Sequence, residues 1–147
     1  MGARTSGRES ALQMLFAHEL VGGSAEHVIH LYWRAFEGHF EVHPDARSYA
    51  EECVRGVTDR LDEVDERLRQ ASANWRLERM TRVDRNTLRL GAYELMARED
   101  VPRAVILDEA VELAKRFGSE GSGAFVNGVL DRVAELLGRR AAPAKAP

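Results

Sequence analysis

The sequence predicts an all-α protein of six or seven helices, packed as one bundle or as two sub-bundles. Three observations predict this class. Apolar residues recur at spacings of three and four along nearly every segment, as a helix with one buried face requires. No run alternates apolar and polar residues with period two, so no strand is expected. Glycine or proline separates the apolar segments, where helices end and turns begin.

Length and composition indicate one soluble domain. The 147 residues are 44% hydrophobic and 31% charged, a balance typical of an ordinary globular protein. We expect the domain to cover residues 1–138 and an Ala/Pro/Lys tail, 139–147, to be disordered. The single cysteine excludes an internal disulfide, and no segment is typical of a membrane span or a signal peptide. A cytoplasmic protein without membrane contact is therefore expected.

The first two helices are predicted from short local signals. Apolar spacing indicates a helix from Gly7 to Leu20, and a glycine pair follows it. Ser24 is the type of residue that caps a helix, and the next helix is expected to run from there until Gly38.

The most regular periodicity in the chain lies between residues 49 and 75. It predicts a continuous helical stripe that is buried along one side. A glycine and a Thr-Asp pair inside it leave open whether the segment is one helix or two. The stripe consists of Tyr49, Cys53, Val57, Leu61, Val64, Leu68, Ala71 and Trp75.

Three further helices are expected in the remainder of the chain. Thr81 with Asp84 resembles a capping box at the start of the first. Pro102 suits the first turn of the second, and Gly118 follows its last apolar residue. The last helix is predicted over residues 124–137.

No catalytic constellation, metal site or cofactor site is predicted. His27 and His30 are three residues apart on one expected helix, but no third ligand with a known spacing accompanies them. Cys53 lies on the apolar stripe and is interpreted as a small core residue. The glycines after Phe117 have neither the preceding strand nor the Lys-Ser/Thr of a phosphate loop.

A binding surface is indicated around the stretch FGSEGSGAFVNG, residues 117–128. Single-stranded RNA is held by cations on its phosphates, aromatic faces for its bases and amides for base edges. Lys115, Arg116, Phe125 and Asn127 supply these three kinds of group within thirteen positions. The alternative is that Phe125 belongs to the core and Asn127 only caps a helix. The formal net charge of −3 excludes a protein that coats nucleic acid by bulk charge.

Several blocks resemble the NusB family in order and spacing. They are VDRNTLRLGAYEL at 83–95, VP at 101–102, VILDEAVELAKRFG at 105–118 and FVNGVLD at 125–131. RESALQMLF at 8–16 is similar to the family's opening helix, and the resemblance runs from about Arg4 to Leu137. It implies an all-helical fold of two small bundles.

The resemblance also implies a function and partners. Family members are non-catalytic transcription antitermination factors that bind the boxA segment of nascent ribosomal RNA transcripts. They do so together with NusE, a small-subunit ribosomal protein, and the complex helps RNA polymerase pass terminators. Some members self-associate through the surface that NusE uses, so a homodimer is left open.

Site residues follow from the resemblance position by position. The surface facing NusE would include Phe16 and Asp84. The residues implied for RNA binding are Arg4, Arg8, Lys115, Arg116, Phe125 and Asn127.

One departure from the family pattern concerns the N-terminal arginines. Thr5, Ser6 and Gly7 separate Arg4 from Arg8, where members usually have a denser run of arginines. Fewer phosphate contacts weaken RNA binding and its salt dependence, so weak affinity alone and reliance on NusE are expected. The alternatives are a protein-interaction adaptor with weakened RNA binding, or an RNA-targeting fragment of a ribosomal RNA methyltransferase.

Overall fold

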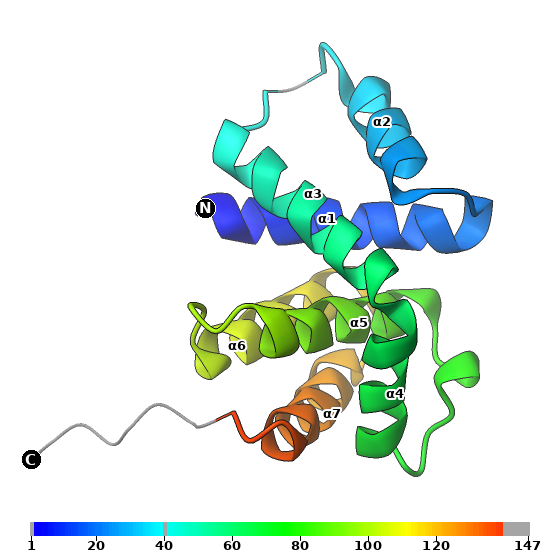
Figure 1. Cartoon of the computed structure of the whole chain (residues 1–147), viewed down its shortest axis with the longest axis vertical. Helices are drawn as coiled ribbons and strands as arrows, with labels where there is room; N and C mark the ends of the chain where they lie inside the picture. The colour runs from blue at the N-terminus through cyan, green and yellow to red at the C-terminus, as the bar shows by residue number, and fades with distance from the viewer. Residues whose placement is uncertain (1, 40, 140–147) are drawn as a thin grey trace, which may run out of the picture. The chain divides into compact units, whose positions relative to one another are not determined.

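The predicted fold class is confirmed. The computed structural model describes residues 2–39 and 41–139, and within these ranges it forms seven α-helices, one short 3-10 helix and no strand (Figure 1). The chain divides into two compact units, unit 1 over Met1–Leu61 and unit 2 over Asp62–Pro147. No helix within the described part is long and apolar enough to cross a membrane.

Unit 1 contains α1 (Ala3–Val21), α2 (Ala25–Phe36) and α3 (Pro44–Asp59), and α1 packs across α3 (Figure 1). A glycine permits this crossing. A Cβ atom on Gly7 would lie 2.8 Å from the carbonyl oxygen of Ala46, closer than such atoms approach. Helix α1 therefore begins four residues before the predicted start and uses Gly7 as a contact point rather than as an end.

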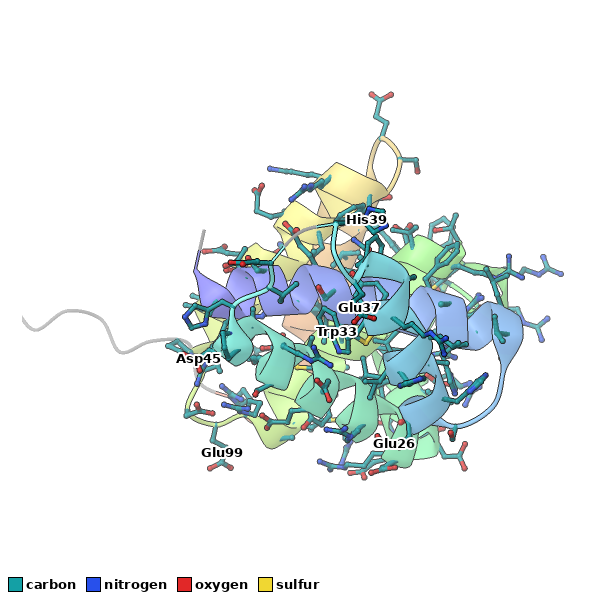
Figure 2. The ribbon with its side chains drawn as sticks, turned by 90° about the horizontal axis from the view of Figure 1, so that it is seen from above. Glu26, Trp33, Glu37, His39, Asp45 and Glu99 are labelled. Carbon is teal, nitrogen blue, oxygen red and sulfur yellow. The ribbon has the colours of Figure 1, made fainter. Side chains whose placement is uncertain are left out.

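Ser24 caps α2 as predicted. The His27 backbone N–H donates to Ser24 Oγ over 3.1 Å. Below this cap, Val28, Ile29 and Trp33 are the buried residues of α2. Trp33 is 8% exposed, whereas Figure 2 shows Glu26 and Asp45 projecting from the unit.

Unit 2 is built from α4 (Leu61–Ala71), the 3-10 helix η1 (Leu77–Arg79), α5 (Arg82–Ala97), α6 (Arg103–Phe117) and α7 (Ser122–Leu136). Helices α5, α6 and α7 pack pairwise on one another. The predicted cap at Thr81 is confirmed, because its hydroxyl accepts a hydrogen bond of 3.1 Å from the Asp84 N–H. In α7, Val126, Val129, Leu130 and Val133 are buried.

The stripe between residues 49 and 75 is two helices. Helix α3 ends at Asp59 and α4 begins at Leu61. Cys53 is 1% exposed, which confirms it as a core residue. Trp75 is different: it lies beyond the end of α4 and is 64% exposed, so its assignment to the buried stripe is wrong. Helix α4 ends at Ala71, so the helical spacing of the stripe does not continue to Trp75.

A buried ion pair joins α4 to α5. Arg89 donates through Nε to Asp65 Oδ1 over 2.8 Å and through Nη2 to Asp65 Oδ2 over 3.0 Å. The two side chains are 14% and 11% exposed, so the pair is largely removed from water. Such a bidentate pair fixes the orientation of one helix against the other.

The structure places Arg139 in the folded part of unit 2, although the tail was expected to begin there. Its guanidinium donates to the carbonyl oxygens of Leu95, Arg98 and Val101, and its own carbonyl accepts from Arg103 Nη1 over 2.8 Å. Residues 140–147 of the expected disordered tail lie outside the described residues.

Candidate nucleic-acid interface

The turn between α6 and α7 needs glycine at two positions for two different reasons. A Cβ atom on Gly118 would lie 2.6 Å from the carbonyl oxygen of Ala114, so there is no room for a side chain. Gly121 has open space around it but a φ of 86°, in the left-handed region that glycine adopts without strain. Ser122 Oγ accepts a hydrogen bond of 3.0 Å from the Ser119 N–H, which closes the turn. The small residues therefore build a fixed turn rather than a loose linker.

Phe125 is held in the first turns of α7 by an aromatic neighbour. It is half-buried, and its ring meets Trp75 edge to face, with centroids 5.7 Å apart and planes at 75°. This is a favourable arrangement for an aromatic pair. The pair leaves Trp75 64% exposed, so its ring is accessible to a ligand.

Trp75 was not predicted from the sequence as a surface residue. The period of the stripe extended to it, but the intervening Ser72 and Asn74 are residue types that favour helix ends over helix interiors. When these residue types are given more weight than the helical spacing of apolar residues, they indicate an irregular segment and an accessible tryptophan.

A hollow of about 260 Å³ lies beside the aromatic pair. One side comes from the chain between Ala71 and Trp75, and the other from Ala124, Phe125, Gly128 and Val129. Gly128 has no atom within 4 Å of the position of a Cβ, so the absence of its side chain keeps this surface open.

The cations and the amide predicted for this region are accessible. The side chain of Lys115 is 65% exposed and its Nζ lies 3.8 Å from Glu112 Oε1. Arg116 is exposed and its guanidinium lies over the ring of Phe117, 5.2 Å from the centroid. Asn127 is exposed and its side-chain amide has no hydrogen-bond partner among the described residues.

The two N-terminal arginines belong to unit 1, and both guanidinium groups lie over the ring of Tyr49. Their distances to the centroid are 5.2 Å for Arg4 and 5.3 Å for Arg8. Arg4 is exposed, whereas Arg8 is only 2% exposed. A direct phosphate contact by Arg8 would require it to leave Tyr49, so Arg4 is the better placed of the two.

The two residues expected to face NusE lie in different units. Phe16 is half-buried on α1, and Asp84 is half-buried in the first turn of α5. Asp84 Oδ1 is buried and accepts no hydrogen bond from any described residue. A buried carboxylate oxygen in this state is unfavourable until a donor reaches it.

The described residues contain no candidate metal site. His27 and His30 are exposed on α2, and no group of three or more histidine, cysteine or acidic side chains is arranged to hold a metal within the described ranges. The fold and this surface are those of a small all-helical binding protein, with the aromatic, cationic and amide groups that single-stranded RNA binders use.

Comparison with known proteins identifies the family. The model of the NusB family matches residues 5–135. The chain is 67% identical over 139 residues to the transcription antitermination protein NusB of Sorangium cellulosum, with 95% of this chain and 96% of that protein covered. It is 50% identical to the NusB of Myxococcus xanthus, with 95% and 99% covered. The chain belongs to the NusB family, a family of non-catalytic factors, so the expectation that it is not an enzyme is confirmed.

Solved structures agree with this assignment. The structure of T. maritima NusB is similar with a TM-score of 0.78 and 34% identity, covering 92% of each chain. A crystal structure of the antitermination factors NusB and NusE in complex with double-stranded RNA is similar with a TM-score of 0.80 and 27% identity, covering 92% of this chain and 98% of that one.

Proposed function

We propose that this protein is a transcription antitermination factor that binds boxA-type single-stranded RNA of ribosomal RNA transcripts together with NusE. In this role it supports the passage of RNA polymerase through terminators, and it works in the cytoplasm. Family membership supports the role. The observation that carries the RNA surface is the exposed Trp75 held edge to face against Phe125, beside accessible cations.

In the proposed mechanism, RNA lies over the start of α7 in unit 2. Lys115 and Arg116 bind phosphates, and a base stacks on the accessible face of Phe125. Trp75 offers a second aromatic surface for the same segment, and the hollow beside the pair can take part of a base. The unpaired amide of Asn127 is able to donate to and accept from a base edge.

In the same proposal, each unit makes its own contacts. Phe16 of unit 1 and Asp84 of unit 2 each contact NusE, and Arg4 of unit 1 contacts an RNA phosphate. A donor from NusE would satisfy Asp84 Oδ1, which has no partner among the described residues. Because the chain carries a formal net charge of −3 and few N-terminal arginines, affinity for RNA alone is expected to be low and to rise with NusE.

Fluorescence anisotropy of a labelled boxA-type RNA tests this function. The protein is titrated alone and with NusE, at two salt concentrations. Saturable binding that weakens with salt and tightens with NusE is expected. Lys115→Glu should weaken binding and flatten its salt dependence, because one phosphate contact is lost.

Arg34→Glu on α2 is the matched control, since it changes the net charge equally from an exposed position outside the proposed RNA surface. It should have a much smaller effect than Lys115→Glu. Equal effects of the two variants would show that only net charge matters. Absence of binding with and without NusE, by a protein shown to be folded, would contradict the proposed function.

A further inference from the structure

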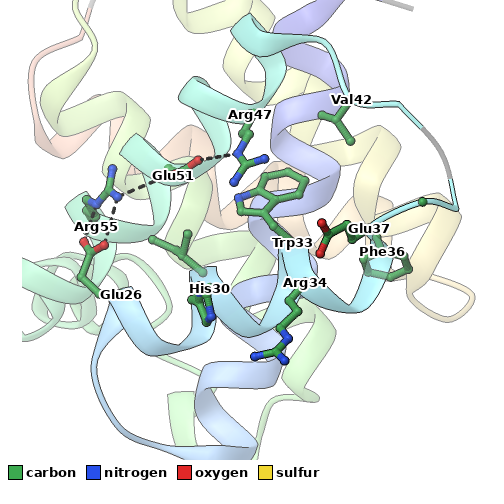
Figure 3. Close-up of a pocket in the computed structure, with 12 residues that line it drawn as sticks. Glu26, His30, Trp33, Arg34, Phe36, Glu37, Val42, Arg47, Glu51 and Arg55 are labelled. Carbon is green, nitrogen blue, oxygen red and sulfur yellow. Dashed lines mark hydrogen bonds and ion pairs between the residues drawn. The ribbon is translucent and has the colours of Figure 1, made fainter.

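A cavity of about 770 Å³ lies between α2 and α3 in unit 1, on residues that the proposed RNA and NusE surfaces do not use (Figure 3). Its volume is within the range of about 300 to 1,000 Å³ that ligand pockets usually have. Ile29, Phe36 and Val42 provide apolar surface. The polar groups of the lining differ in their hydrogen bonding: the carboxylates of one wall are paired, whereas some donors are not.

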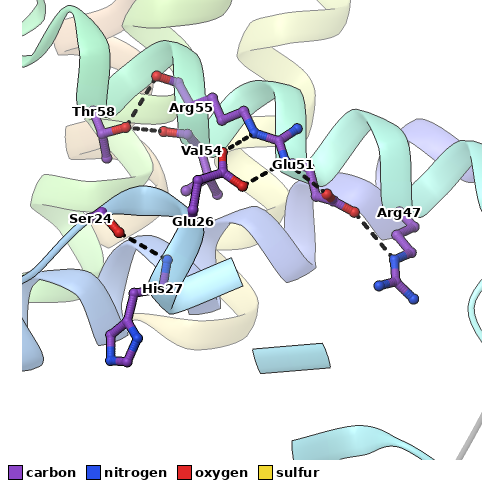
Figure 4. Close-up of polar contacts among 8 residues, drawn as sticks. All are labelled: Ser24, Glu26, His27, Arg47, Glu51, Val54, Arg55 and Thr58. Atoms are coloured by element: carbon purple, nitrogen blue, oxygen red, sulfur yellow. Dashed lines mark hydrogen bonds and ion pairs between the residues drawn. The ribbon is translucent and has the colours of Figure 1, made fainter. Parts of the chain in front are cut away.

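A chain of ion pairs forms one wall of the cavity (Figure 4). Arg55 Nη2 donates to Glu26 Oε2 and to Glu51 Oε1, each over 3.1 Å. Glu51 Oε2 accepts from Arg47 Nε over 3.2 Å. The hydrogen bond from Arg55 lowers the pKa of Glu26 from its ordinary value, so the carboxylate stays charged. The carboxylates of this wall are therefore occupied by the arginines beside them.

Two donor groups of the lining, by contrast, have no acceptor among the described residues. Trp33 is 8% exposed, and its Nε1 is buried with no acceptor among the described residues. The guanidinium of Arg47 lies over the indole ring, 5.0 Å from the centroid. Arg47 uses Nε for Glu51, and its two Nη atoms make no hydrogen bond with any described residue. Figure 3 shows the Arg47 guanidinium across the indole, whose nitrogen lies toward Glu51 and Arg55.

These groups define the ligand by complementarity. A buried N–H without an acceptor, such as that of Trp33, is unfavourable. The Arg47 side chain is 55% exposed, so its two Nη groups, which bond no described residue, are open to a carboxylate in bidentate geometry. The formal charges of the lining cancel, because Arg34, Arg47 and Arg55 are opposed by Glu26, Glu37 and Glu51. Because the lining carries no net charge, it offers no excess of positive charge for a doubly charged phosphate. A singly charged carboxylate attached to an apolar body fits both the donors and the apolar surface.

We propose that this cavity, the α2–α3 pocket, binds a monoanionic carboxylate on an apolar body, such as the C-terminal end of a peptide chain. The carboxylate accepts from Trp33 Nε1 and the Arg47 Nη atoms, and the apolar group packs on Ile29, Phe36 and Val42. The pocket would give the protein a ligand or partner site separate from its RNA surface.

The two tryptophans of the chain, Trp33 and Trp75, allow a direct test. The indole N–H signals of ¹⁵N-labelled protein are followed by NMR during titration with N-acetyl-leucine and with an N-acetylated Ala-Ala-Leu peptide that has a free carboxylate. The Trp33→Phe variant assigns the signals. The Trp33 signal is expected to shift to saturation, and the Trp75 signal is expected not to move.

The experiment separates the two sources of the carboxylate and tests the donors. Saturation by both probes means that a small carboxylate suffices, and saturation by the peptide alone means that a chain end is required. The same peptide with a C-terminal amide should bind the unaltered protein at least tenfold more weakly. The peptide with the free carboxylate should bind the Arg47→Gln variant at least tenfold more weakly than it binds the unaltered protein. Arg76→Gln, which removes an exposed arginine of unit 2, should leave the affinity unchanged. An unmoved Trp33 signal, or equal binding of acid and amide, would overturn the proposal.

Discussion

Replacement of Phe125 with alanine is expected to weaken binding of boxA-type RNA by about 1 to 3 kcal/mol, roughly 5- to 150-fold in Kd. The reason is that the variant loses the ring on which a base stacks and also the edge contact that holds Trp75. Because Trp75 is 64% exposed and meets Phe125 with centroids 5.7 Å apart, removal of one ring releases the other. Anisotropy with labelled RNA measures the loss.

Two measurements separate stacking from a role in the core. Phe36→Ala removes another half-buried phenylalanine, from α2, and should leave the RNA affinity unchanged. The folded fraction of each variant is determined by circular dichroism before the titration. If Phe125→Ala unfolds at a lower temperature but binds RNA with full affinity in its folded fraction, Phe125 is a core residue and does not stack.

Replacement of Asp65 with alanine is expected to lower the free energy of unfolding by about 3 kcal/mol. The variant leaves the Arg89 guanidinium, 14% exposed, without the carboxylate that accepts its Nε and Nη2 hydrogen bonds. A largely buried charge that loses its opposite charge is strongly destabilising, whereas an exposed pair contributes less than about 1 kcal/mol. Urea denaturation of the purified protein measures the difference.

The chain offers an exposed pair in the same unit as a control. Arg69 and Glu78 lie 3.4 Å apart, and their side chains are 50% and 61% exposed. Glu78→Ala should therefore change the free energy of unfolding by only a few tenths of a kcal/mol. Equal losses from Asp65→Ala and Glu78→Ala would show that burial of the Asp65–Arg89 pair contributes nothing to stability.

Local features of the fold could be predicted because they depend on neighbours in sequence. Ser24 and Thr81 cap their helices through the N–H three residues later, so residue type and position suffice. Gly118 was expected at the end of α6 and lies there, but not as a left-handed cap. Its φ of −93° is open to other residues, and it is the nearby Ala114 carbonyl that excludes a side chain.

Features that depend on tertiary contacts could not be predicted. Asp65 and Arg89 are 24 positions apart, and no local pattern indicates that they pair. The burial of Arg8 against Tyr49 likewise depends on the packing of α1 across α3. Lys115, Arg116, Phe125 and Asn127 of the proposed RNA surface were indicated by residue type and then by the resemblance to the family. Trp75 was found only when the structure placed it in solvent beside Phe125.

The fluorescence of Trp75 during titration with boxA-type RNA tests the proposed RNA surface most directly. The Trp33→Phe variant leaves Trp75 as the single tryptophan. Its emission should be quenched to saturation at the same RNA concentrations at which anisotropy reports binding, because a bound base would cover the indole. Binding seen by anisotropy with unchanged Trp75 emission would mean that the RNA lies elsewhere and that the aromatic pair on α7 is not its site.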